Sequence, residues 1–74
     1  ELLLALKSKR IELARRRRVP AYIIFPDATL HQMLIHKPQS LDAMGKLNGV
    51  GSKKLEKYGE DFISVINEII SNEK

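Results

Sequence analysis

The sequence predicts an all-α domain, a compact bundle of about five short helices. Apolar residues recur at the three- and four-residue spacing of helices along most of the 74 residues. Proline and glycine interrupt this pattern where short connections between helices are expected. Residues 21–25 could form a strand, but the chain offers no second strand to pair with it. A chain of this length has room for one domain, so we expect residues 1–74 to fold as a single unit.

The first helix is expected over residues 2–18, where no proline or glycine occurs. Arg10 falls inside the apolar arc of this helix, so we expect it to pair with a carboxylate within the fold. Pro20 ends the helix, because the residue before a proline is pushed out of the α region. The apolar side of the helix consists of Leu2, Leu3, Leu6, Leu13 and Ala14, widened by Leu4 and Ile11.

Residues 19–26 predict an extended connection that crosses the core. In an extended chain alternate side chains share a side. Ile23 and Phe25 would then face one way, and Tyr22 and Ile24 the other. Tyr22 could therefore be exposed on this connection or packed in the core, and we favour the exposed position.

Two helices are expected between residues 27 and 47. Asp27 is a natural N-cap for the first of them, because its carboxylate can accept from free backbone N–H groups. This helix ends before Pro38, and its apolar stripe is Leu30, Met33 and Leu34. Ser40 can cap a short third helix that reaches residue 47.

Glycines divide the remaining chain. Gly49 and Gly51 end the third helix, and a fourth is expected over residues 52–58. Gly59 then separates this helix from a fifth, whose first turn carries two acidic residues, where the helix dipole favours negative charge. The core face of the fifth helix consists of Phe62, Val65, Ile66, Ile69 and Ile70.

Positive charge is concentrated in two segments. The chain carries 13 basic and 9 acidic residues, a net charge of +4. Residues 1–20 hold seven basic and two acidic side chains, residues 37–57 hold five and two, and residues 58–74 are acidic. If the two basic segments meet in space, they form a one-sided surface for a polyanion. The alternative is that these charged side chains simply lie on solvated helix surfaces and bind no polyanion.

The stretch ARRRRVPAY, residues 14–22, is a candidate for contact with nucleic acid. Successive helix residues point about 100° apart, so four consecutive arginines cannot all face the core. Guanidinium groups suit phosphate oxygens through their planar fork of donors. A tyrosine on the following connection could stack on an unpaired base. The candidate residues are Arg15, Arg16, Arg17, Arg18 and Tyr22.

The stretch LNGVGSKKLEKYG, residues 47–59, fits a helix-hairpin-helix turn. Glycines permit the tight turn, and backbone N–H groups at the start of the following helix can bind a phosphate. Lys53, Lys54 and Lys57 would add positive charge beside it. The alternative is that the hairpin merely turns the chain between two packed helices.

No catalytic or metal site is expected. His31 and His36 are five residues apart, which is a poor spacing for sharing a metal on one helix face. Residues 49–54 lack the Gly-Lys-Ser/Thr ending of a Walker loop. The absence of cysteine suits a reducing compartment, and no apolar run approaches the ~20 residues of a membrane span. We expect a monomeric, non-enzymatic, intracellular domain that needs no metal or cofactor of its own.

Four stretches carry a family resemblance: LKSKRIELA (residues 6–14), VPAYIIFPDATL (19–30), PQS (38–40) and LNGVGSKKLEKYG (47–59). In this order and spacing they resemble the HRDC domain (helicase and RNase D C-terminal), in particular its version in RecQ helicases. In that version the tyrosine matching Tyr22 and nearby basic residues contact single-stranded DNA. The four arginines at residues 15–18 depart from the family pattern and would enlarge this patch.

The resemblance implies an auxiliary nucleic-acid-binding domain of a RecQ-type, ATP-dependent DNA helicase. The chain begins with Glu1 instead of methionine, so we expect a piece of a longer protein. The resemblance further implies that this protein is bacterial, cytoplasmic and associated with the nucleoid. ATP and Mg²⁺ would bind only the motor domain of that protein. The expected partner is DNA, single-stranded or partly duplex. Two alternatives stay open: a module that docks on the helicase core or another protein, and an RNA-binding accessory domain of an RNase D-like exonuclease.

Overall fold

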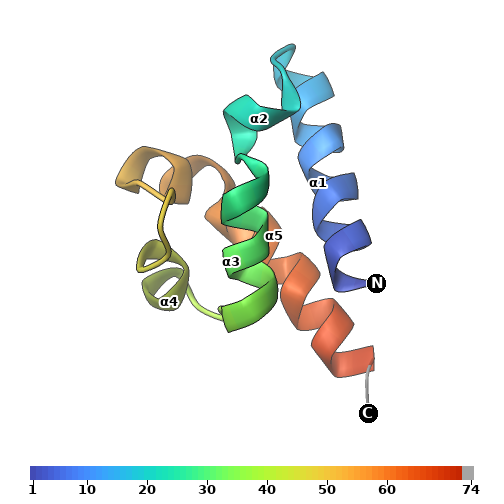
Figure 1. Ribbon diagram of the computed structural model, residues 1–74, viewed down its shortest axis with the longest axis vertical. Coiled ribbons are helices and arrows are strands. Elements are labelled where there is room, and N and C mark those ends of the chain that lie inside the picture. Colours follow the sequence, from blue (N-terminus) through green and yellow to red (C-terminus); the bar gives the residue numbers. More distant parts are fainter. Residues whose placement is uncertain (73–74) are drawn as a thin grey trace.

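Five helices and the turns between them make up residues 1–72, the part of the chain that a computed structural model describes (Figure 1). No strand occurs within this part, so the all-α prediction is confirmed. The molecule measures 36 × 22 × 18 Å along its principal axes. The helices are α1 (Leu2–Arg17), α2 (Ala21–Ile24), α3 (Asp27–His36), α4 (Leu41–Gly45) and α5 (Ser52–Asn72).

The two long helices, α1 and α5, pack against each other and support the three shorter ones. Figure 1 shows α2 and α3 running back alongside α1, with α4 on the far side of α3, where it packs on α5. The core lies between these helices, and each of the five contributes to it. Its fully buried side chains are Leu6, Ile24, Phe25, Leu30, Met33, Met44, Phe62 and Ile66.

The helix α1 buries a narrower stripe than the sequence pattern suggests. Leu4 and Ile11, which were expected to widen the stripe, are 69% and 44% exposed. A helix on the outside of a small bundle can cover only part of its circumference, so the outermost apolar positions face solvent. Its buried residues are Leu2, Leu6, Leu13 and Ala14.

Basic residues cap two of the helices at their C-terminal ends. Arg18 follows α1 with φ 58°, and Lys37 follows α3 with φ 47°. The N–H of Arg18 donates to the carbonyl of Arg15 at 3.3 Å, which ends α1 one residue earlier than expected. Glycine usually occupies this left-handed position, but a positive side chain suits the negative end of the helix dipole.

A one-turn helix, α2, replaces the extended connection that the sequence predicted. Pro20, with φ −62°, precedes it, and the carbonyl of Pro20 accepts from the N–H of Ile23 at 3.0 Å. Because the segment turns as a helix, the neighbouring residues Ile24 and Phe25 are both buried, whereas Tyr22 and Ile23 are exposed. The expected alternation was therefore wrong, although Tyr22 is exposed as expected.

One of the two predicted N-caps is confirmed. The Ser40 hydroxyl accepts from the backbone N–H of Ala43 at 3.1 Å and closes the first turn of α4. Asp27 is not a cap: it is the first residue of α3, and Pro26 precedes it. The carboxylate of Asp27 instead lies 2.8 Å from Nη1 of Arg10, which confirms the ion pair expected for that arginine.

The fourth and fifth predicted helices are one continuous helix, α5, with Gly59 buried in its middle. Glycine costs a helix only about 1 kcal/mol relative to alanine, and apolar burial on both sides of Gly59 offsets this. A Cβ at this position would lie 3.0 Å from Cδ2 of Leu41 and from Cδ1 of Leu55. The missing side chain therefore makes room for α4 and does not end the helix.

Packing against α3 fixes the turn before α5. Gly49 has φ +89°, and a Cβ there would collide with Oγ1 of Thr29. Thr29 is buried, and its hydroxyl donates to the carbonyl of Asn48 at 3.4 Å. Gly51, in contrast, has open space where a Cβ would stand. Gly49 is thus required by the fold, and Gly51 is not.

Replacing Gly49 with alanine is expected to destabilise the domain by at least about 1–2 kcal/mol, the cost of a left-handed backbone for a residue with a Cβ. The collision with Thr29 adds to this cost. Gly51→Ala is the matched control and should change stability by less than about 0.5 kcal/mol. Urea unfolding of both variants measures the difference, and equal effects would contradict the packing role of Gly49.

Candidate nucleic-acid interface

The arginine run occupies the last turn of α1 and the residue that caps it. All four side chains, residues 15–18, are exposed. Arg17 also lies against the body of the protein, because its guanidinium carbon is 5.2 Å from the centroid of the Tyr58 ring. Tyr58 belongs to α5 and is 5% exposed. The contact places the end of α1 over the first half of α5.

A second cation lies over the neighbouring aromatic ring. The Lys54 ammonium is 5.8 Å from the centroid of Phe25. Phe25 and Tyr58 meet edge-on, with centroids 6.0 Å apart and ring planes at 77°. A cation over an aromatic face gains roughly 0.5–1 kcal/mol near the surface. The two basic segments that are separate in the sequence therefore meet over one aromatic pair.

Tyr22 lies on α2, at the same end of the molecule as the C-terminal end of α1 (Figure 1). Its side chain is 64% exposed, while Ile24 and Phe25 anchor the same segment in the core. An exposed aromatic ring near positive charge is what stacking on an unpaired base requires. The structure thus gives Tyr22 a suitable place, and its contact with a base stays a prediction.

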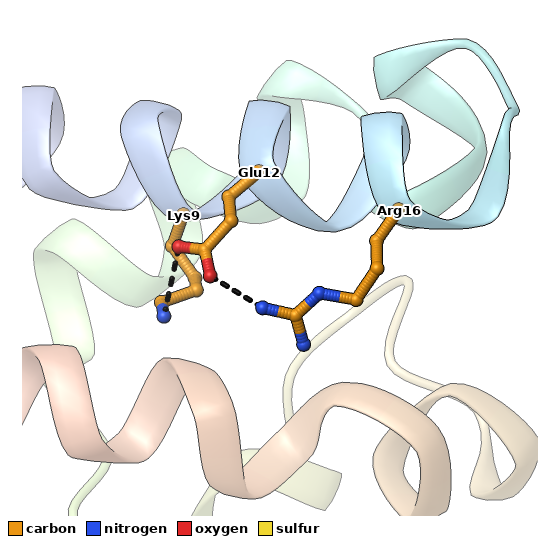
Figure 2. Close-up of polar contacts among 3 residues, drawn as sticks. All are labelled: Lys9, Glu12 and Arg16. Atoms are coloured by element: carbon orange, nitrogen blue, oxygen red, sulfur yellow. Dashed lines mark hydrogen bonds and ion pairs between the residues drawn. The ribbon is translucent and has the colours of Figure 1, made fainter.

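Arg15 and Arg16 lie along a different flank of α1. Figure 2 shows Glu12 between two cations: its Oε1 is 3.2 Å from Nζ of Lys9, and its Oε2 is 2.6 Å from Nη2 of Arg16. An exposed pair of this kind is worth at most about 1 kcal/mol, so a phosphate could replace Glu12 at a small cost. Arg15 lines an open hollow of about 710 Å³ between α1 and α5. These contacts of Arg15 and Arg16 do not involve the aromatic pair, at which Arg17 lies.

Lys53 and Lys57 extend the positive surface along the first turns of α5. Both side chains are exposed, and their four-residue spacing places them on one side of the helix. Among residues 1–72, neither has a carboxylate within ion-pair distance. The first backbone N–H groups of α5 also have no carbonyl partner within the helix, and the space beside Gly51 is open. These features suit a second phosphate contact, which stays a prediction.

The sequence did not predict three residues that contact the cations of this surface. Tyr58 and Phe25 hold the two cations, and Glu12 competes for Arg16. The four-residue spacing of Glu12 and Arg16 could have indicated their pair. No local signal could have indicated the contact of Arg17 with Tyr58, because it depends on how α1 packs on α5.

Arg10 lies behind this surface, on the buried side of α1. Its Nη1 donates to the carbonyl oxygen of Phe25 at 2.9 Å and to the carboxylate of Asp27. The hydrogen bond from Arg10, followed by its positive charge, lowers the pKa of Asp27 below its ordinary value, and Lys7 and His31 add smaller contributions. The ionised form of Asp27 is thus stabilised by the fold.

Within residues 1–72, no group of three or more histidine, cysteine, aspartate or glutamate side chains is placed to hold a metal ion. The two histidines considered from the sequence, His31 and His36, both lie exposed on α3. In the same part of the chain no helix is both long and apolar enough to cross a membrane.

Comparison with known proteins gives the family. The sequence profile of the HRDC domain matches residues 1–66. This chain belongs to the HRDC family. The solved structure described as "D. radiodurans RecQ HRDC domain 3" superposes on it with a TM-score of 0.91 and 32% identity, over 93% of this chain and 91% of that one. The HRDC-like fold expected from the sequence is thereby confirmed.

Similar segments occur in two kinds of helicase. This HRDC domain is 41% identical over 68 residues to the ATP-dependent DNA helicase RecQ of Haemophilus influenzae, covering 92% of this chain and 11% of the helicase. It is 41% identical over 66 residues to the ATP-dependent DNA helicase UvrD2 of Mycobacterium tuberculosis, covering 89% of this chain and 9% of that protein. The chain thus spans about a tenth of these relatives. The HRDC domain is an auxiliary, non-catalytic module of helicases.

Asp27 is expected to make the stability of the domain depend on acidic pH. Its pKa in the folded protein lies below the value of 3.8 for the free side chain. The contribution of its ionised form is therefore complete above about pH 5 and is lost as the pH falls through the lowered pKa. Urea unfolding at a series of pH values should show a larger loss for the wild type than for Asp27→Asn. Equal losses would mean that the pair with Arg10 adds no stability.

Proposed function

We propose that this HRDC domain binds single-stranded or partly duplex DNA as an auxiliary domain of an ATP-dependent DNA helicase. The observation that carries the proposal is the meeting of α1, α2 and α5. There, two cations from separate basic segments lie over a buried aromatic pair, close to the segment that exposes Tyr22. Contacts of this kind hold the DNA backbone and carry little information about base sequence.

In this proposal Arg17 and Lys54 make the central phosphate contacts. The guanidinium carbon of Arg17 lies 5.2 Å from the centroid of the Tyr58 ring, and no ion pair within residues 1–72 involves Arg17, so its N–H groups can donate to phosphate oxygens. Because the side chain is already held, less conformational entropy is lost when it binds. Tyr22 stacks on an unpaired base, which favours single strands over duplex. The outer phosphate contacts are Arg15, Arg16, Arg18, Lys53 and Lys57.

The parent protein proposed is a RecQ-type helicase, and the equal identity to UvrD2 makes a UvrD-type helicase the second candidate. ATP and Mg²⁺ would then act in the motor domain of that protein, and the HRDC domain would use neither. The proposed location is the cytoplasm of a bacterium, with the nucleoid DNA. Because the relatives named above are helicases, they favour this assignment over an RNase D-like exonuclease.

One observation favours a second function, docking on the helicase core or on another protein. The hollow between α1 and α5 has apolar residues in its lining, and Leu4 and Ile11 on α1 are exposed. Binding through such a surface would depend weakly on salt, whereas phosphate contacts release counterions. The apolar residues of the lining are Ala5, Ile11, Val65 and Ile69.

The salt dependence of binding separates these two functions. If about three phosphates are neutralised, log K against log[salt] for a labelled single strand should fall with a slope near −2. The dissociation constant should lie at roughly 10⁻⁴–10⁻⁶ M at physiological salt. Arg17→Ala should weaken binding to every DNA and reduce the slope by up to ~0.7.

Lys37→Ala is the matched control for Arg17→Ala. It removes one positive charge at the C-terminal end of α3, the end of that helix opposite to its junction with α2. The slope should then stay at the wild-type value. A flat salt series for the wild type would contradict phosphate binding and favour docking. Equal slope changes for the two variants would contradict a localised interface.

Tyr22→Ala should act differently, because it leaves the charge unchanged. The salt slope should be kept, while binding to single strands weakens by ~1–3 kcal/mol and binding to duplex much less. Ile23→Ala is the control, since Ile23 is the neighbouring exposed residue of α2 and carries no aromatic ring. Fluorescence anisotropy with both DNA forms gives these values. If Tyr22→Ala binds single strands as well as the wild type does, stacking is excluded.

A further inference from the structure

The segment that carries Tyr22 has little structure of its own to hold it in place. The helix α2 is a single turn of four residues, Ala21–Ile24, without a side-chain cap at its start. A helix of this length is not stable by itself in water. Tyr22 and Ile23 are exposed, so the apolar contacts that fix the segment come from Ile24 and Phe25.

Arg10 ties this segment to the middle of α1. Its Nη1 donates to the carbonyl oxygen of Phe25 at 2.9 Å and lies 2.8 Å from Oδ1 of Asp27. Phe25 is the first residue after α2, and Asp27 is the first residue of α3. One guanidinium nitrogen therefore holds both ends of the short link between the two helices. The Phe25 backbone is extended, with φ −151° and ψ 136°, so its carbonyl needs a partner from outside a helix.

Stability alone does not account for an arginine at this position. The Arg10 side chain is 11% exposed, and its buried Nε has no hydrogen-bond partner among residues 1–72. Burying a charge and leaving a donor unpaired both oppose folding. An apolar side chain of similar length would fill the same space without either cost. An arginine here is better explained by the conformation in which it holds its two acceptors, the Phe25 carbonyl and the Asp27 carboxylate.

We propose that Arg10 is a positioning residue for Tyr22: by holding the link behind α2, it sets the direction in which the exposed tyrosine ring faces DNA. Arg10 is largely enclosed and is paired with Asp27, so it offers no free charge to a phosphate. This role rests on the proposed DNA-binding function. It requires that Arg10 affects single-strand binding through Tyr22.

A double-mutant cycle tests this role. Arg10→Met removes the guanidinium but keeps an unbranched side chain. Tyr22→Ala alone should weaken binding to a labelled single strand by about 5–150-fold, the loss of one stacked base. Arg10→Met alone should cause a large part of that loss. In the Tyr22→Ala background, Arg10→Met should cause no further loss. An effect of the Arg10 charge that does not act through Tyr22 would instead appear equally in both backgrounds, so the cycle separates the two.

Two further variants keep the test decisive. Ile66→Val also loosens the core, in the second half of α5, and should leave single-strand affinity at the wild-type level when measured where every variant is folded. If Arg10→Met fails to fold, Asp27→Asn takes its place, because Asp27 is exposed and its loss weakens the same link. We expect a smaller loss of affinity from it, again absent in the Tyr22→Ala background.

The outcomes separate the two proposals. If Arg10→Met, or Asp27→Asn in its place, weakens binding equally with and without the Tyr22 ring, or does not weaken it, the positioning role is overturned and the proposed function stands. If Ile66→Val weakens single-strand binding as much as Arg10→Met does, the effect of Arg10 is general loosening of the core, which also overturns the positioning role. If Tyr22→Ala itself has no effect on single-strand binding, stacking fails, and the positioning role fails with it.

Discussion

Phe25 is fully buried, and its ring meets the rings of Tyr58 and Phe62 edge-on, at centroid distances of 6.0 and 5.1 Å. The rest of the structure depends on this contact, because it fastens the link between α2 and α3 to the middle of α5. The carbonyl of the same residue accepts the hydrogen bond from Arg10, and the Lys54 cation lies over its ring. One side chain therefore joins the core to the candidate interface.

The position of Phe25 also explains why the two basic segments meet. The C-terminal end of α1 and the first turns of α5 are brought together by core packing, and their side chains follow. Arg17 then lies over Tyr58 and Lys54 over Phe25, each attracted by an aromatic face. Each of these contacts contributes a modest gain of roughly 0.5–1 kcal/mol.

The candidate interface and the charged network of α1 lie on different parts of this small domain. The candidate interface lies at helix ends, whereas a different flank of α1 carries the Lys9–Glu12–Arg16 network and the hollow beside α5. The relatives of this chain include both RecQ and UvrD2 helicases, so the same auxiliary domain occurs with different helicases.

Local patterns in the sequence were sufficient for much of the fold. Helical periodicity predicted α1 and α3, the Ser40 cap was recognisable from its residue type, and the place of Arg10 in an apolar arc predicted its ion pair. The helices and the cap depend on residues within one or two helical turns of each other, so the sequence contains them directly. For the ion pair the sequence predicted only that Arg10 needs a carboxylate, because its partner Asp27 lies on a different helix, α3. The family resemblance added the assignment to a RecQ-type helicase and the expected contact of Tyr22 with single-stranded DNA.

Contacts between distant segments decided the rest. The sequence could not show that α2 forms a turn of helix, because core burial of Ile24 and Phe25 outweighs the extended preference of that stretch. Nor could it show that α5 continues through Gly59, because the reason for that glycine is the nearby side chain of Leu41. The sequence by itself determined the helical class, the charge and the candidate residues. Tertiary packing alone decided that Arg17 and Lys54 lie over the two rings of one aromatic pair, because no local pattern links side chains that lie so far apart in the chain.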